Sequence, residues 1–161
     1  MEAFTLEFKS LQKALDAFLG DLVGTYKDLL ARDGKKATGN LIKSVKSLSI
    51  AFEGTQCTGS ISLASYWKYV EYGRRKGAKQ PPFKNILEWV KVKPVIPRPI
   101  NGIKPTQKQL AFMICRKIAR DGIEPGKQFK EALDLAWARN EKKISGAISE
   151  DLAATITLIK L

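Results

Sequence analysis

The feature of this sequence that most constrains its fold is a long amphipathic stripe near the N-terminus. Apolar residues recur every three or four positions over residues 4–30, and they are Phe4, Phe8, Leu11, Leu15, Phe18, Leu22, Tyr26 and Leu29. This spacing predicts one helix of about seven turns, which ends at Asp33-Gly34. A helix of about 40 Å is long for a chain of 161 residues. We therefore expect its stripe to cover either the domain's own sheet or another subunit.

From Ser47 the period of the apolar residues changes to two. The apolar members of two alternating runs are Leu48, Ile50 and Phe52 in the first and Cys57, Gly59, Ile61 and Leu63 in the second. A turn at 54–56 separates the runs, so they predict an antiparallel hairpin over about 47–63. Cys57 is expected to be a small core residue on its apolar face.

Shorter helices are predicted around this hairpin. Thr38 is expected to cap a helical turn, and Pro82 suits the first turn of a helix that continues through Val90. Thr106 and Gln109 predict a capping box for a helix that Gly122 ends. A further helix is indicated over 129–137 by apolar residues at helical spacing.

Two other segments complete the predicted architecture. Residues 93–105 hold four prolines and predict an extended loop. Residues 152–161 are rich in Thr, Ile and Leu, which predicts a C-terminal strand that pairs with the hairpin or with a neighbouring chain. The expected fold class is α+β in a single domain over 1–161, with a small antiparallel sheet packed against the long first helix and several shorter ones.

The net charge of +12 is unevenly distributed along the chain. Residues 35–104 hold 14 basic and 3 acidic side chains, whereas residues 1–34 hold 4 basic and 6 acidic ones. The basic loop 73–82 lies in the central region, and we expect Arg74, Arg75, Lys76 and Lys79 to be its contact residues. Such a region favours an acidic partner, although each lysine taken alone is more simply read as a solvated surface residue.

The sequence contains no histidine, which removes the commonest nucleophile pairs, most zinc sites and any imidazole base. Glu71 and Glu88 stand 17 residues apart, a separation with no recognisable acid–base spacing, and a surface salt bridge is the simpler interpretation of each. The glycines of residues 54–59 lack the lysine that a phosphate-binding loop requires. We therefore predict no catalytic residues, no metal and no cofactor.

Aromatic residues directly precede the basic loop. Tyr66, Trp67, Tyr69 and Tyr72 followed by several cations are compatible with backbone contacts and base stacking in a nucleic-acid-binding protein. Core packing of these aromatics is the favoured interpretation, since no recognition-helix or RNA-binding signature surrounds them. The N-terminal segment carries acidic residues and predicts neither a signal peptide nor a membrane span, so we expect synthesis in the cytoplasm.

Three short motifs in the central segment carry a resemblance. Gly39, Asn40, Leu41 and Ser44 precede the predicted strands, Tyr66, Val70, Glu71, Tyr72 and Gly73 follow them, and Gln80, Pro81 and Pro82 begin the next helix. Over residues 37–90 this order resembles the neck, or tail-completion, proteins of lambdoid tailed phages. The chain differs from that pattern in having Arg74 where threonine usually follows the glycine.

The resemblance implies a non-enzymatic virion protein, made in the cytoplasm of a bacterial host. It implies a homo-oligomeric ring that connects the portal or an adaptor protein to the tail, with no membrane partner. Gly73 would then end a helix so that the basic loop projects, toward an acidic protein surface or toward packaged DNA. The alternative is a free-standing nucleic-acid-binding protein that uses the same loop. A third class is a magnesium-dependent nuclease built on Glu71 and Glu88, and we expect the protein not to cleave nucleic acid.

Overall fold

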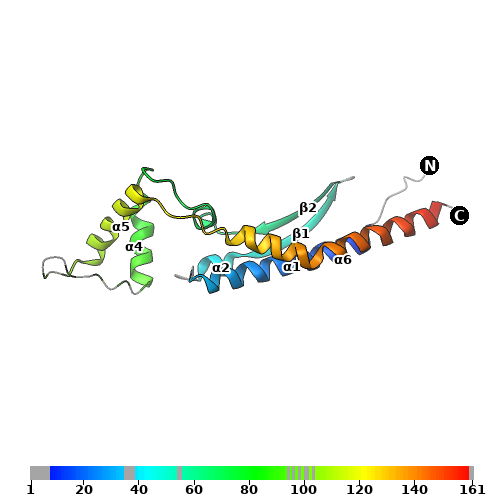
Figure 1. Ribbon diagram of the computed structural model, residues 1–161, viewed down its shortest axis with the longest axis horizontal. Helices are drawn as coiled ribbons and strands as arrows, with labels where there is room; N and C mark the ends of the chain where they lie inside the picture. The colour runs from blue at the N-terminus through cyan, green and yellow to red at the C-terminus, as the bar shows by residue number, and fades with distance from the viewer. Residues whose placement is uncertain are drawn as a thin grey trace. The chain divides into compact units, whose positions relative to one another are not determined.

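The computed structural model describes residues 8–34, 39–53, 56–93 and 104–159, together with the single positions 95, 97, 99 and 102. Within these residues it contains six helices and one two-stranded antiparallel sheet (Figure 1). The elements in chain order are α1 (Lys9–Arg32), α2 (Asn40–Ser44), β1 (Lys46–Glu53), β2 (Gln56–Ser62), α3 (Trp67–Glu71), α4 (Phe83–Val92), α5 (Gln107–Asp121) and α6 (Gln128–Ile159). The expected α+β class, with a long N-terminal helix and a hairpin, is confirmed.

Contacts within the chain divide it into two compact units. Unit 1 consists of Met1–Leu29, Val45–Ser62 and Phe129–Leu161, and unit 2 consists of Leu30–Ser44 and Leu63–Gln128. The sequence predicts a single domain over 1–161, and whether the two units fold as one domain stays a prediction.

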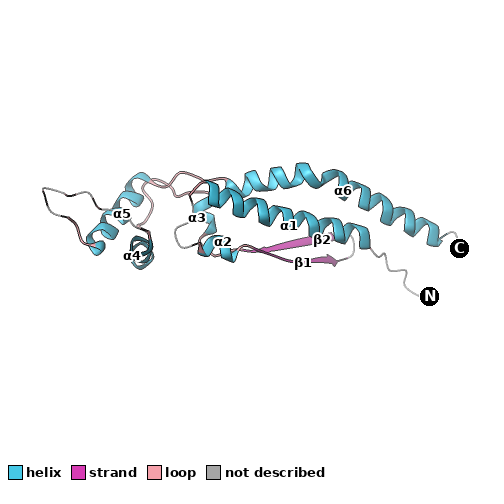
Figure 2. Cartoon of the chain, turned by 90° about the horizontal axis from the view of Figure 1, so that it is seen from below, coloured by secondary structure: helices cyan, strands magenta, loops and turns pink. Residues whose placement is uncertain are grey.

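In unit 1, α1 and α6 run side by side in opposite directions (Figures 1 and 2). Near one end the rings of Tyr26 and Phe129 meet edge to face at 5.3 Å. Midway, the side-chain amide of Asn140 donates a hydrogen bond of 2.9 Å to Asp21. At the other end, Asp151 accepts hydrogen bonds from the backbone N–H groups of Ser10 and Leu11. Apolar and polar contacts therefore hold the helix pair along most of its length.

The hairpin of unit 1 packs on α1 through few side chains. Ile50 is buried, Phe8 stacks on Phe52 at 5.9 Å, and Leu19 lies against Gly59. The pairing register shifts between Ser47 and Ile50, which is a bulge, and bulges interrupt the alternation of faces along a strand. Leu48 is consequently exposed, although the sequence places it on the same face as Ile50.

The expected position of Cys57 is wrong, because this residue is exposed on β2. Its cross-strand partner is Phe52, and every residue of β2 except Ile61 is exposed in the described chain. The alternation of apolar residues identified the strand correctly. The alternation did not reveal that most residues of β2 are exposed.

The expected C-terminal strand is also wrong, because α6 continues through these residues to Ile159. Thr and Ile favour strands only weakly, and tertiary contacts override that preference. The buried stripe of α6 continues at helical spacing as far as Asp151, which contacts α1. The helix signal was hidden because the stripe is built mostly from small and polar residues, namely Ala132, Ala136, Asn140, Ile144, Ala147 and Asp151.

In unit 2, α4 and α5 form as predicted, and they pack against each other. The capping box at the start of α5 is present, since the Thr106 N–H donates to Gln109 Oε1 at 2.8 Å and the Gln109 N–H donates to Thr106 Oγ1 at 3.3 Å. Ala111 and Cys115 on α5 and Val90 on α4 are buried. Gly122 ends α5 with a φ of 78°, the left-handed region that favours glycine.

Some expectations fall on residues that the structure does not describe. The Thr38 cap, the first residues of the predicted N-terminal helix and the turn at 54–55 lie outside the described residues. The same is true of residues 94, 96, 98, 100, 101 and 103 in the proline-rich segment 93–105.

Candidate binding surface of unit 2

The charge of the chain separates almost completely between the two units. Unit 2 holds 19 Lys and Arg residues against 5 Asp and Glu residues, a net charge of +14. Unit 1 holds 9 basic and 11 acidic residues, a net charge of −2. Anions are therefore attracted to unit 2, where the predicted basic loop lies.

Backbone hydrogen bonds fix the first part of the basic loop. Arg74 and Ile123 form a two-way bridge in which each N–H donates to the other's carbonyl, at 2.8 and 2.9 Å. The N–H of Gly77 donates to the carbonyl of Ala119 in the last turn of α5 at 2.8 Å. The loop is thus attached to the end of α5, whereas the resemblance to phage neck proteins implies that it projects after Gly73.

This attachment depends on close approach of the backbone at Gly73. The residue has a φ of 69°, and a Cβ atom at this position would stand 2.2 Å from the carbonyl oxygen of Ile123. The opposite segment has the same requirement at Gly122, where a Cβ atom would stand 2.5 Å from the carbonyl oxygen of Arg74. Two segments can interlock here because both carry glycine at the contact.

The Arg74 side chain is engaged within its own loop. Its Nη2 donates to the carbonyl oxygen of Lys79, and its guanidinium carbon lies 5.4 Å from the centre of the Tyr69 ring. Its Nε atom is buried. The positive charge of Arg74 therefore stabilises the loop from within, while Arg75, Lys76 and Lys79 are exposed.

Lys76 belongs to the same electrostatic neighbourhood as the end of α5. A hydrogen bond from Arg120 lowers the pKa of Asp121, and the charges of Lys117 and Lys76 lower it further against opposing desolvation. Arg120 Nε lies 2.7 Å from Asp121 Oδ1, so these two residues largely neutralise each other. Lys76 and Lys117 remain as cations near that pair.

A row of exposed side chains on α5 was not predicted from the sequence. Lys108, Phe112 and Arg116 follow one another at four-residue spacing and are exposed, as is Lys117, whereas Ala111 and Cys115 are buried. The guanidinium carbon of Arg116 lies 5.9 Å from the centre of the Phe112 ring. The signal in the sequence was the four-residue spacing of Lys108, Phe112 and Arg116, which places them on successive turns of one helix face.

The tyrosines before the basic loop are not packed in the core, so that expectation is wrong. Tyr66, Tyr69 and Tyr72 are exposed, with Tyr72 reaching 68%. The Tyr72 ring lies 5.8 Å from that of Trp67, and the Lys68 ammonium lies 5.6 Å from the centre of the Tyr69 ring. α3 has only five residues, and its short turn leaves several aromatics outside the core of unit 2.

The first motif has structural roles in unit 2. Leu41 is buried, Ser44 Oγ donates to the Leu41 carbonyl at 2.7 Å, and the N–H of Ala64 donates to Ser44 Oγ at 2.9 Å. Gly39 has a φ of 72° directly before α2. The first motif therefore closes α2 and attaches it to the segment that leads into α3.

The second and third motifs frame the basic loop. Val70 is half-buried, and its carbonyl accepts a hydrogen bond of 3.0 Å from the N–H of Gly126. Glu71 is 3% exposed, and its carbonyl accepts one of 3.1 Å from the N–H of Lys127. Gln80 and Pro82 are exposed, Pro81 is half-buried, and Pro82 is the N-cap of α4.

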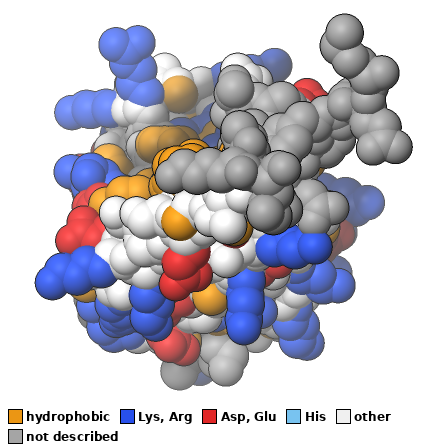
Figure 3. Space-filling model, turned by 90° about the vertical axis from the view of Figure 1, so that its right-hand side faces the viewer, with side chains coloured by type: hydrophobic (Ala, Val, Ile, Leu, Met, Phe, Trp, Pro, Cys, Tyr) orange, Lys and Arg blue, Asp and Glu red, His pale blue; other side chains and the backbone are white. Residues whose placement is uncertain are grey.

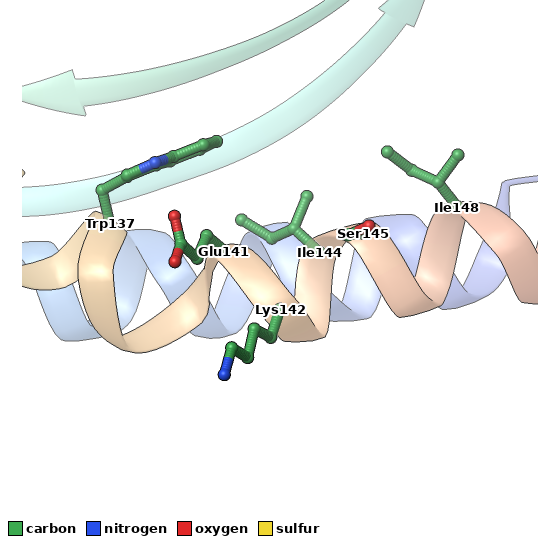
Figure 4. Close-up of a pocket in the computed structure, with 6 residues that line it drawn as sticks. All are labelled: Trp137, Glu141, Lys142, Ile144, Ser145 and Ile148. Carbon is green, nitrogen blue, oxygen red and sulfur yellow. The ribbon is translucent and has the colours of Figure 1, made fainter.

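Unit 1 has a different kind of surface. Apolar side chains are exposed along α6, and Figure 3 shows such side chains at the surface beside Lys and Arg on the face where α6 ends. An open hollow is lined by Trp137, Glu141, Lys142, Ile144, Ser145 and Ile148. In Figure 4, Trp137, Ile144 and Ile148 point to the same side of α6.

The described residues contain no group of three or more Cys, Asp or Glu side chains arranged to hold a metal ion. Glu88 is exposed on α4, in contrast to the buried Glu71. None of the helices in the described ranges is long and apolar enough to cross a lipid bilayer.

Comparisons of the chain with protein-family models, with curated proteins and with solved structures find no match. The resemblance to phage neck proteins therefore rests on the motif residues themselves.

Proposed function

We propose that this chain is a structural subunit of the neck of a tailed-phage virion, forming a ring that joins the portal or an adaptor protein to the tail. The motif residues of segment 37–90 support the family assignment. The observation that carries the proposal is the exposed apolar face of α6, because a protein that acts by assembly must present surface that another subunit buries.

The exposed apolar residues of α6 extend over most of its length. They are Leu133, Leu135, Trp137, Ile148, Leu152 and Ile156, with Trp137 at 50% and Ile156 at 54% exposure. Trp137 and Ile148 point to the same side of α6 (Figure 4), and exposed apolar side chains that gather on one side are typical of an interface. Fully burying one such side chain contributes about 1.5–3 kcal/mol. In a ring, a second copy of the chain is the partner that buries these side chains.

The hairpin offers a second means of contact. The described sheet has two strands, so each strand has an outer edge with backbone groups directed away from its partner. Such edges are templates for pairing with another chain. Strand addition would supply main-chain hydrogen bonds between neighbouring subunits, with little demand on side-chain identity. In a ring, this contact is heterologous, since each subunit meets the next head to tail.

The assembly is tested by measuring the mass of the purified protein with size-exclusion chromatography and light scattering. We expect a ring for the natural chain and a monomer for the double variant Trp137→Glu/Ile148→Glu, because both changes place a charge on the apolar face. The matched control is Ser149→Glu/Ala153→Glu, which adds the same charge at other exposed positions of α6. Circular dichroism verifies that each variant is folded.

A natural chain that stays monomeric at every concentration, or that is missing from phage particles by electron microscopy, would contradict the proposal. Equal disruption by the control variant would show that charge on α6, not loss of the apolar contact, prevents assembly.

The net charge of unit 2 favours a second candidate, a free-standing nucleic-acid-binding protein. The two candidates differ in whether the monomer or the assembled ring is the functional species. Tight binding of nucleic acid by a monomer in a gel-shift experiment would favour the second candidate over a virion subunit.

A further inference from the structure

We propose that one continuous surface of unit 2 binds the phosphate backbone of double-stranded DNA. This α5–loop surface consists of Lys108, Phe112, Arg116 and Lys117 on α5 and Arg75 and Lys76 in the basic loop. The inference deepens the proposed function by naming the partner of its basic unit. It rests on the charge and geometry of unit 2, and it does not require a ring to form.

The first step is that α5 presents a straight row of outward side chains. The capping box fixes the start of the helix, and Lys108, Phe112 and Arg116 are exposed at four-residue spacing, so they form one row on the helix surface. Lys108 and Arg116 stand two turns apart in this row, a distance of about 12 Å at 1.5 Å per residue. Over about 12 Å a DNA duplex presents about seven phosphate charges. The two cations of the row can therefore each meet a different phosphate.

The second step is that the basic loop extends this row. The hydrogen bond from Gly77 to Ala119 holds the loop against the last turn of α5, and the bridge between Arg74 and Ile123 holds its first residue. Lys76 and Lys117 both act electrostatically on Asp121. The cations of the loop and of the helix consequently belong to one surface, held in place by backbone contacts.

The third step concerns the carboxylates near this surface. Asp121 is bound to Arg120 by two hydrogen bonds of 2.7 and 2.9 Å, so this pair adds little net charge. Glu124 is the other exposed carboxylate in the segment that follows α5. The cations of the α5–loop surface outnumber these carboxylates. Because like charges close together destabilise a folded unit, their concentration here is better explained by an anionic partner.

The composition of the surface favours DNA over an acidic protein. Protein interfaces have an apolar centre that is depleted of charge. The exposed side chains of α5 include two large apolar groups, Phe112 and Met113, together with the cations Lys108, Arg116 and Lys117. The Arg116 guanidinium beside Phe112 suits phosphate, which arginine binds through two parallel hydrogen bonds. Lys and Arg side chains that contact phosphates carry no sequence information, so we expect binding to be independent of DNA sequence.

The test is fluorescence anisotropy of a labelled 30-base-pair duplex (about three helical turns) at several salt concentrations. The triple variant Lys76→Gln/Arg116→Gln/Lys117→Gln is expected to bind at least about tenfold more weakly, with a salt slope reduced by about 2–3. The matched control is Lys13→Gln/Lys142→Gln/Lys143→Gln, which removes the same charge from exposed positions of unit 1. We expect the control to bind within about twofold of the natural chain.

Three results would overturn the inference: no salt-dependent binding by the natural chain, equal loss in both triple variants, or equally tight binding of poly-L-glutamate. The last would assign the surface to an acidic protein. Testing Trp137→Glu/Ile148→Glu in parallel separates this inference from the proposed ring. Duplex binding by a natural chain that forms no ring would contradict only the ring, and a ring without duplex binding would contradict only this inference.

Discussion

At the scale of single residues, three glycines decide how the basic loop is held. Gly73 and Gly122 bring the backbones of the loop and of the segment after α5 into contact, and Gly126 lies close to the carbonyl of Val70. A side chain at any of these positions would meet a backbone atom at 2.5 Å or less. Glycine is therefore required at all three positions by close packing, and at Gly73 and Gly122 also by the positive φ.

The contrast between Gly73 and Gly77 gives a prediction. Both have positive φ, at 69° and 77°, but a Cβ atom at Gly77 would meet nothing within 4 Å. Gly77→Ala should cost only the backbone strain, about 1–2 kcal/mol in free energy of unfolding. Gly73→Ala adds a backbone collision and should cost at least about 2 kcal/mol more. Urea denaturation of both variants measures the difference, and equal losses would mean that the loop does not pack closely on Ile123.

At the scale of elements, α6 completes the beginning of α1. Residue 8, which precedes the first residue of α1, is phenylalanine and has no side-chain acceptor for the free N–H groups of the first turn. Asp151 accepts these hydrogen bonds instead, from Ser10 at 3.1 Å and from Leu11 at 2.8 Å. A carboxylate is also favoured here by the positive end of the helix dipole. One helix thus supplies the N-cap of another, 140 residues away in the sequence.

Removing this carboxylate should weaken unit 1 in a pH-dependent manner. Desolvation raises the pKa of Asp151, but the backbone hydrogen bonds from Leu11 and Ser10 outweigh it, so the pKa lies below its ordinary value of 3.8. A lowered pKa in the folded state means that the stabilisation is present above pH 3.8 and is lost as the pH falls through the folded value. We expect Asp151→Asn to cost about 1 kcal/mol at neutral pH.

The measurement is the free energy of unfolding of the natural chain and of Asp151→Asn between pH 7 and pH 2.5. The difference between them should be constant near neutral pH and should shrink at the acidic end. Glu150→Gln, at the exposed neighbouring position, is the control and should have almost no effect. A difference that grows on acidification would show that folding raises the pKa of Asp151 instead of lowering it.

At the scale of the whole molecule, the separation of charge between the units is the dominant property. Unit 2 carries +14 and unit 1 carries −2, so electrostatic repulsion acts mainly within unit 2. Salt reduces this repulsion, since the screening length falls from about 30 Å at 0.01 M to about 8 Å at 0.15 M.

This separation predicts that salt protects one unit more than the other. We expect amide hydrogen exchange in α4 and α5 to slow when salt rises from about 0.01 M to about 0.15 M. Exchange in α6 should change little, because unit 1 is nearly neutral. Mass spectrometry of peptides from each unit measures both at once. An equal response in the two units would mean that the net charge of unit 2 does not limit its stability.

Local signals in the sequence determined most of the elements. An element was predictable where its own residues contain the signal that starts it, the spacing of its apolar side chains and the signal that ends it. The capping box at Thr106 and Gln109, the apolar spacing through Val90 and the alternation around residues 54–55 are all read within a few neighbouring positions. Local hydrogen bonds and side-chain faces fix such elements, so α4, α5 and the hairpin were predictable.

Contacts between distant segments decided the rest. The tail is helical because Asp151 and the small residues before it face α1, and the exposure of Cys57 and Tyr72 follows from how little of the chain covers them. The joining of the basic loop to α5 depends on Ile123 and Ala119, more than 40 residues further along the chain. The sequence alone established where positive charge is concentrated, because charge follows from composition. Which cations face solvent together follows from packing, and only the tertiary structure could decide it.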